Sequence, residues 1–184
     1  MTMAELGEVL DGKRTLPAKP VVLTFDDGYR DFYTDVFPLL KTYGTKATVY
    51  VIPGFLNGSN YLTDAQLQEI AGDNTIEIAA HTVHHVWLKN MPREKAQQEI
   101  VESKTALETA IHKPVVSFAY PYGAFDEQAI SLVKQAGFST AVSTIPGVTI
   151  DQADRFFIFR LRPGGRTGDG LVHFLDQVKV NPYK

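Results

Sequence analysis

Short apolar runs alternate with amphipathic stretches along most of the chain. Several of these runs are continuously apolar rather than alternating with polar residues. Continuous apolar runs are typical of parallel strands that are covered on both faces. Six runs are predicted as strands: Val21 to Phe25, Ala47 to Ile52, Thr75 to Ala80, Val115 to Tyr120, Phe138 to Ser143 and Phe156 to Leu161.

Helix signals lie between the predicted strands. The clearest covers Pro92 to Ile111, which begins with a residue suited to the first helical position and repeats apolar residues at helical spacing. Thr63 and Gln66 resemble a capping box that opens a shorter helix, and Asp126 can cap a third that runs to Gly137. This repeated order of strand and helix predicts an α/β fold with a parallel sheet or barrel.

Length and composition fit an ordinary globular protein. The chain has 184 residues, 44% of them hydrophobic and 21% charged, so we expect one domain over residues 1–184. Residues 1–20 are interpreted as an N-terminal extension. They lack the apolar core of a signal peptide, so they are either the start of a cytoplasmic protein or follow a removed leader.

Charge and cysteine content exclude several classes of function. The net charge is -3, and lysines and arginines are scattered, which argues against a nucleic-acid partner. No apolar run approaches the roughly 20 residues that a membrane-spanning helix needs. The absence of cysteine means that any bound metal must be held by nitrogen and oxygen.

Polar groups follow the first, third and fourth predicted strands. Asp26 and Asp27 come directly after the first, His81 ends the third, and Tyr120 to Gly123 ends the fourth. Because the carboxyl ends of parallel strands meet at one rim, we expect these groups to lie together. Their convergence is stronger evidence than any one motif, since Asp-Asp-Gly alone is a common turn sequence.

His81 and His85 are spaced to bind one ion. If the segment turns helically after the strand, both rings lie on one face. With one carboxylate they form a site that suits zinc or another divalent transition metal. Neighbouring aspartates on extended backbone point in different directions. One of Asp26 and Asp27 should therefore ligate the ion, while the other accepts a proton from a water whose pKa the ion lowers.

Two other histidines, His84 and His112, are predicted to lie outside the metal site. His84 faces away from His85 in any regular conformation and is predicted as a rim residue rather than a third ligand. His112 is predicted at the C-terminal end of a helix, where the helix dipole stabilises it.

Three ordered motifs resemble the polysaccharide deacetylase family, the carbohydrate esterases of the fourth class. They are TFDDG at 24–28, HTVHH at 81–85 and FAYPYG at 118–123. The third motif is similar to that of the branch with poly-β-1,6-N-acetylglucosamine deacetylases. The resemblance implies a distorted, incomplete (β/α) barrel of about six to seven parallel strands. It also implies one divalent ion, with zinc expected first and cobalt, nickel or manganese as alternatives.

The same resemblance assigns roles to the motif residues. Asp26 matches the general base, and the backbone N–H of Tyr122 matches a donor to the oxyanion of the tetrahedral intermediate. Pro121 and Tyr122 match residues that wall the substrate groove. The metal ligands match Asp27, His81 and His85.

Two features of the family have no clear counterpart. Ala119 stands where many members carry an arginine that orients the base, and Arg160 either replaces that arginine or is a surface or capping residue. His173 follows Leu171 in a pattern resembling the family's acid histidine. We favour a surface position for His173, because the segment reads as an amphipathic helix with this residue on its polar side.

The leading hypothesis is a metal-dependent hydrolase that removes N-acetyl groups from an N-acetylglucosamine-containing polysaccharide or oligosaccharide, with metal-bound water as the nucleophile. An acetylxylan O-acetyl esterase and a catalytically silent carbohydrate-binding relative are the alternatives. Two adjacent carboxylates do not suit a glycoside hydrolase, whose carboxyls flank one bond. We expect a monomer outside the cell or in its envelope, with a cytoplasmic location as the alternative.

Overall fold

A computed structural model describes residues 1–148, 150 and 152–180, with the side chains of residues 177–180 left aside. Five strands form one sheet in the order β1-β2-β3-β4-β5, and every neighbouring pair is parallel. The strands are β1 (Leu23–Phe25), β2 (Ala47–Val51), β3 (Ile76–Ala80), β4 (Ser117–Ala119) and β5 (Thr140–Val142). The sheet is curled into half a barrel, which confirms the predicted class of fold.

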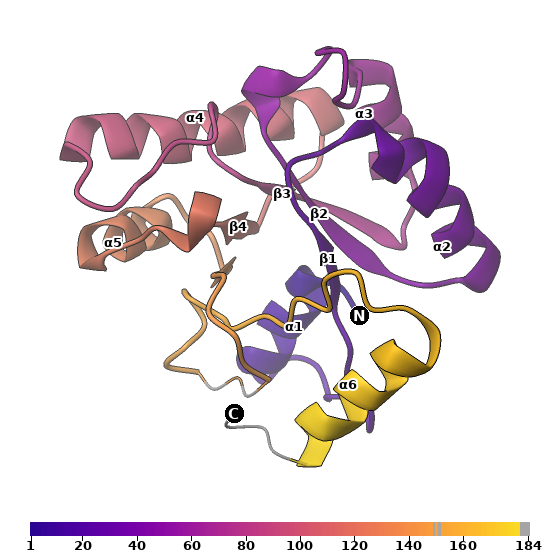
Figure 1. Ribbon diagram of the computed structural model, residues 1–184. Coiled ribbons are helices and arrows are strands. Elements are labelled where there is room, and N and C mark those ends of the chain that lie inside the picture. The colour runs from indigo at the N-terminus through magenta and orange to yellow at the C-terminus, as the bar shows by residue number, and fades with distance from the viewer. Residues whose placement is uncertain (149, 151, 181–184) are drawn as a thin grey trace.

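Helices cover both faces of the curled sheet (Figure 1). The α-helices are α1 (Met3–Leu10), α2 (Phe37–Tyr43), α3 (Asp64–Gly72), α4 (Arg93–Ile111), α5 (Glu127–Gln135) and α6 (Gly168–Val180). Three short helical segments are the π-helix η1 (Phe32–Val36) and the 3₁₀ segments η2 (Pro53–Phe55) and η3 (Pro121–Gly123). None of the described helices is both long and apolar enough to span a bilayer.

Side chains on the two faces of the strands enter different clusters. Val49 on β2 packs in the larger cluster beneath the outer helices, whereas the next residue, Tyr50, packs in the smaller inner cluster. The same inner cluster contains Met3 and Leu6 of α1. Residues 1–20 are therefore more than an extension, because their first helix covers the inner face of the sheet.

The predicted helix signals are confirmed. Thr63 and Gln66 form a complete capping box at the start of α3. The Asp126 side chain accepts a hydrogen bond of 2.9 Å from the Ala129 N–H at the start of α5. Pro92 is the N-cap of α4 rather than its first helical residue, so the helix begins one residue later than predicted, at Arg93. His112 ends that helix in the left-handed conformation, with φ of 54°.

The predicted sixth strand is wrong for the described residues, and the expected six to seven strands reduce to five. Only one bridge joins this segment to the sheet, in parallel between Val142 and Ile158. The segment facing it continues through Pro146, which has no N–H to donate to a ladder. Arg160, two residues beyond Ile158, lies on the same inner side of the segment, where its side chain reaches Asp26.

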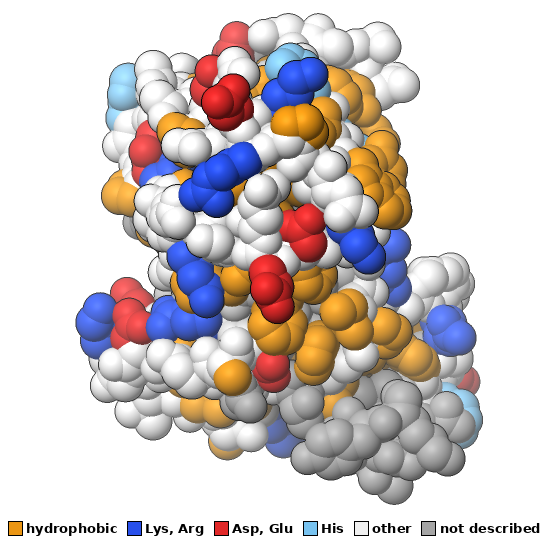
Figure 2. Space-filling model, turned by 90° about the vertical axis from the view of Figure 1, so that its left-hand side faces the viewer, with side chains coloured by type: hydrophobic (Ala, Val, Ile, Leu, Met, Phe, Trp, Pro, Cys, Tyr) orange, Lys and Arg blue, Asp and Glu red, His pale blue; other side chains and the backbone are white. Residues whose placement is uncertain are grey.

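Charges on one face of the molecule are mixed in sign. Figure 2 shows lysine and arginine side chains interspersed with aspartate and glutamate, while hydrophobic side chains gather across the middle of that face. Such a surface does not present one large field of a single sign.

Candidate active site

Loops after β1, β3 and β4 converge at the carboxyl ends of the strands. The register pairs Phe25 with Val49 and Val51 with Ala80, so the residues after β1 and β3 emerge at the same rim. Asp27 has a φ of 76°, a left-handed conformation that non-glycine residues seldom adopt. Asp26 and Asp27 face different partners, as the sequence predicted, but this left-handed turn replaces the extended backbone on which that prediction relied.

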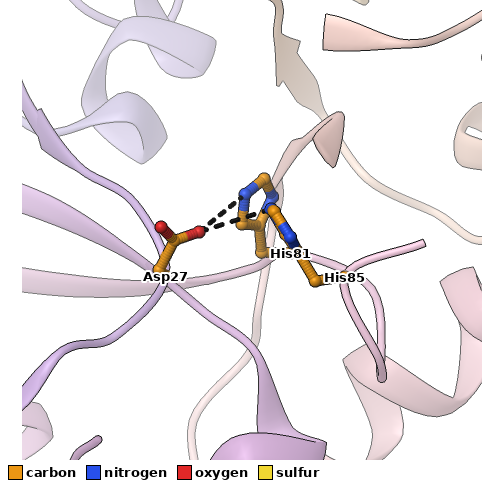
Figure 3. Close-up of side chains that lie close together, drawn as sticks. All are labelled: Asp27, His81 and His85. Atoms are coloured by element: carbon orange, nitrogen blue, oxygen red, sulfur yellow. Dashed lines mark ion pairs between the residues drawn. The ribbon is translucent and has the colours of Figure 1, made fainter. Parts of the chain in front are cut away.

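Asp27, His81 and His85 form a compact group with three potential metal-binding atoms. The Asp27 Oδ1 atom lies 3.4 Å from Nε2 of His81 and 3.4 Å from Nε2 of His85. One ligand atom from each residue lies within 4.8 Å of the others. Figure 3 shows the carboxylate pointing at both imidazole rings. Two imidazoles and one carboxylate, so arranged, fit a divalent transition metal ion with positions left for other ligands.

The protonation of both rings suits metal binding. Nδ1 of His81 lies 2.7 Å from the carbonyl oxygen of Ala119. Because a carbonyl only accepts, Nδ1 carries the proton and Nε2 keeps its lone pair for an ion. Burial, and then the proximity of His81, lower the pKa of His85, which favours its neutral form. Ala119 therefore orients His81, one of the candidate metal ligands, through its backbone carbonyl.

The loop that presents the histidines is not helical. Thr82 and His85 have φ values of 60° and 55°, and these two left-handed residues bring the rings together without the helical turn considered from the sequence. The Thr82 hydroxyl accepts a hydrogen bond of 3.3 Å from the Val86 N–H, which ties the two ends of the loop to each other.

Glu99 on α4 holds the middle of the same loop. Its Oε2 accepts hydrogen bonds from the N–H groups of Val83, at 2.9 Å, and of His84, at 3.0 Å. Its Oε1 lies 2.8 Å from Nδ1 of His84, whose ring is 63% exposed. His84 is thus a rim residue outside the metal-binding group, as predicted. No sequence motif identified Glu99, because α4 carries several glutamates at similar spacing.

Asp26 is paired with Arg160, which comes from the segment predicted as the sixth strand. The guanidinium donates to Oδ1 at 2.7 Å and to Oδ2 at 2.8 Å. Arg160 is itself held by the Ser143 carbonyl at 2.8 Å and contacts the Thr24 hydroxyl at 3.2 Å. Burial raises the pKa of Asp26, but the hydrogen bonds and charge of Arg160 outweigh burial and lower that pKa below its ordinary value.

This geometry decides between the two interpretations of Arg160. The side chain is 11% exposed and binds the carboxylate in bidentate fashion, so it is not a surface residue. Ala119 occupies the position where many family members carry an arginine, and Arg160 reaches Asp26 from elsewhere in the chain. The second arginine of the segment, Arg162, is 68% exposed and lies 4.0 Å from Asp26 Oδ2.

Tyr122 and Pro121 lie in η3, directly after β4. Tyr122 has a φ of 59° and is 61% exposed, whereas Pro121 is buried. The Tyr122 ring centroid lies 4.5 Å from that of His85 and 6.0 Å from that of Trp87. Of the two residues expected to wall a groove, Tyr122 is the one that faces solvent beside the histidines.

His173 is not part of this group. It lies exposed on α6, and Figure 1 shows α6 on the opposite side of the molecule from α3 and α4. The group of metal-binding side chains found in the described part of the chain does not include it.

Comparison with known proteins agrees with the geometry. YxkH of Bacillus subtilis is 29% identical over 180 residues, covering 97% of this chain and 64% of its own length. The Escherichia coli K12 poly-β-1,6-N-acetyl-D-glucosamine N-deacetylase is 27% identical, covering 75% of this chain and 27% of the relative. This chain thus spans less than two thirds of either curated relative.

A solved structure shares the fold. The Streptococcus pyogenes deacetylase PplD, determined in complex with acetate, is 27% identical with a TM-score of 0.77, covering 85% of this chain and 72% of PplD. The sequence profile of the family described as "Polysaccharide deacetylase" matches residues 13–141. With this match over more than half of its length, the chain belongs to the polysaccharide deacetylase family.

Proposed function

We propose that this protein is a metal-dependent hydrolase that removes N-acetyl groups from an N-acetylglucosamine-containing polysaccharide. The observation that carries the proposal is that an arginine-bound carboxylate and a carboxylate with two imidazoles lie together at one rim. A carboxylate fixed by Arg160 lies next in sequence to one that faces two imidazoles, and the two groups are equipped for different tasks.

Asp27, His81 and His85 would hold the ion, for which zinc is the first candidate and cobalt, nickel and manganese are alternatives. A divalent ion held there supplies Lewis acidity toward a carbonyl and lowers the pKa of water. The protein contributes two imidazoles, and the Ala119 carbonyl orients the ring of His81 through Nδ1.

Asp26 acts as the general base. Its lowered pKa keeps it ionised at neutral pH, and an ionised carboxylate accepts the proton of the attacking water. Arg160 fixes both oxygens of Asp26, so the base meets that water in one orientation. The backbone N–H of Tyr122, turned by the left-handed φ of that residue, donates to the oxyanion as charge develops.

The substrate class is proposed from the relatives. The E. coli relative is named for poly-β-1,6-N-acetyl-D-glucosamine, and we propose a similarly linked or related glycan for this chain. Polymers of this kind lie at the cell surface, so the proposal includes action outside the cell or in its envelope.

An O-acetyl esterase acting on acetylated xylan is the second candidate. An amide nitrogen must be protonated to leave, whereas an alkoxide leaves more readily and needs no strong acid. His173, which best resembles the family's acid, is exposed on α6, and its surface position supports the ester as the second candidate.

The test measures acetate release from β-1,6-linked N-acetylglucosamine oligomers, chitooligosaccharides and acetylated xylan, together with the metal content of the protein. We expect Asp26→Asn to bind the metal but release no acetate, and Asp27→Ala to lose the metal. Asp169→Asn, an exposed change on α6, serves as the control and should match the wild type.

Three results would overturn the enzyme proposal: no stoichiometric divalent metal, no acetate from any substrate, or unchanged hydrolysis by Asp26→Asn. Oligosaccharide binding without hydrolysis would identify a catalytically silent relative. Faster release from xylan than from both aminosugar polymers would favour the esterase.

A further inference from the structure

Tyr50 is a large, fully buried side chain on the inner face of the sheet. It comes from β2, which lies between β1 and β3, the strands that lead to Asp26 and His81 (Figure 1). The register pairs Tyr50 with Ala79, two residues before His81 on the same strand. Because alternate residues of a strand share one face, Tyr50 lies directly beneath the rim that carries both groups of the candidate site.

The hydroxyl of Tyr50 is anchored on the far side of β3. It lies 2.9 Å from Oγ of Ser117, which accepts a hydrogen bond of 3.0 Å from the Thr140 hydroxyl. Ala79 stands between Tyr50 and Ser117 in this row of the sheet, and its small side chain leaves room for the ring to cross. Ser117 and Thr140 are buried, and buried hydroxyls keep their hydrogen-bond partners. The ring is therefore fixed at its far end.

The ring of Tyr50 also supports Arg160. The Cζ atom of Arg160 lies 5.8 Å from the ring centroid, within the range at which a guanidinium is attracted by an aromatic face. The same guanidinium binds both oxygens of Asp26. Since the arginine side chain is only 11% exposed, little water competes for it, and the ring limits where the guanidinium can lie.

His81 packs against the same ring. The two ring centroids are 6.4 Å apart, with an angle of 51° between the planes, a common arrangement for packed aromatic rings. The carbonyl that holds Nδ1 of His81 belongs to Ala119, two residues beyond Ser117 on β4. One strand thus anchors both the hydroxyl of Tyr50 and the imidazole beside it.

We infer that Tyr50 is a positioning residue that holds Arg160 and His81 in a fixed arrangement, and with them the candidate base and the metal-binding group. Tyr50 is 0% exposed, so it acts through these two neighbours and not by touching the substrate. A residue that only filled the core would be replaceable by a side chain of similar volume, whereas this role requires an aromatic ring. The inference rests on the proposed function and adds to it a residue outside the three motifs.

The first test compares Tyr50→Phe, which keeps the ring, with Tyr50→Met, which fills the space without one. We expect Tyr50→Met to lower kcat for acetate release about tenfold with KM nearly unchanged, and Tyr50→Phe to retain most of the wild-type kcat. Phe138→Met is the matched control, because Phe138 is equally a buried ring but lies in the outer cluster. If Tyr50→Met does not fold, Tyr50→Leu takes its place.

A double-mutant cycle tests whether Tyr50 acts through Arg160. With the metal site saturated, the loss of kcat caused by Tyr50→Met should shrink from about tenfold to less than about twofold when Arg160→Ala is already present, because residues that act through one another are not additive. A tenfold loss in both backgrounds would show that Tyr50 does not position Arg160 and would overturn the inference.

The affinity for Zn²⁺, measured by competition with a chelator, separates this inference from the proposed function. Tyr50→Met should weaken Zn²⁺ binding about tenfold, while Tyr50→Phe and Phe138→Met leave it unchanged. If no substrate releases acetate but this pattern of affinities persists, the proposed function fails and the positioning role stands. If acetate is released and Tyr50→Met matches Phe138→Met in both kcat and Zn²⁺ affinity, the positioning role is overturned and the proposed function stands.

Discussion

Arg160 is predicted to be the residue that positions Asp26, and its removal gives the sharpest test of the site. The two hydrogen bonds between them measure 2.7 and 2.8 Å, and the side chains are only 11% and 22% exposed. A charge-assisted hydrogen bond contributes about 1.5–3 kcal/mol. Truncating one partner of a buried ion pair costs about 3–5 kcal/mol, so Arg160→Ala should also lower the free energy of unfolding.

The same substitution should also lower the catalytic rate. Without Arg160, the Asp26 carboxylate is free to rotate, and misplacing a reacting group by about 1 Å lowers the rate about 10²-fold. We therefore expect kcat/KM for acetate release to fall about 10²-fold, or about 2.7 kcal/mol, mainly through kcat. Arg160→Lys keeps the charge but loses the bidentate geometry, so its loss should be about tenfold.

The control and a rescue experiment separate positioning from general damage. Arg162→Ala removes an exposed guanidinium 4.0 Å from the same carboxylate and should change kcat/KM by less than about twofold. Added guanidinium ion should restore activity to Arg160→Ala but not to Asp26→Asn. The reasoning is refuted if folded, metal-loaded Arg160→Ala keeps most of its activity, or if Arg162→Ala loses as much.

Two further predictions concern the residues that support the site. Glu99→Ala should weaken metal binding about tenfold, measured by competition with a chelator, because it frees the loop between the histidines. Glu102→Ala, an exposed change on the same helix, should leave the metal affinity unchanged, and an equal affinity in both variants would contradict this role. Burial raises the pKa of Glu77 above its ordinary value despite hydrogen bonds from Thr48 and Ala4, so the folded state holds this proton more tightly than the unfolded state. The protonated side chain stabilises the folded state fully below the ordinary pKa. This stabilisation is lost as pH rises through the raised pKa, by about 1.4 kcal/mol for each pH unit between the ordinary and the raised pKa. In urea unfolding of the metal-free protein, the free energy of unfolding of Glu77→Gln minus that of the wild type should grow from acidic to neutral pH. A difference that does not change with pH would disprove this account.

Local signals in the sequence were sufficient for most of the secondary structure. The capping box at Thr63, the cap at Asp126 and the apolar run at Ala47 each depend on residues a few positions apart. The segment of Phe156 to Leu161 was misjudged because its composition fits a strand. Whether such a segment pairs depends on the chain facing it, and in the described residues the two form one bridge, at Ile158, with separate backbone hydrogen bonds on either side.

The convergence of the candidate metal ligands could be predicted, because motif spacing and the ends of strands can be recognised in the sequence. Asp27, His81 and His85 were brought together by three parallel strands whose order followed the order in the sequence. The conformation of the histidine loop was not predictable, since two left-handed residues replaced the expected helical turn. Glu99 was also hidden, because its partners are backbone N–H groups without any sequence signature.

The sequence by itself determined the candidate chemistry of this protein: which side chains are suited to hold an ion, which carboxylate lies beside them, and which family the chain resembles. Only the tertiary structure decided how the candidate base is held and how the loops around it pack. Arg160 is separated from Asp26 by 134 residues, and Tyr29 meets Tyr61 through the packing of a loop. Contacts of this kind depend on where the chain returns in space, which the curled sheet sets and the local sequence does not.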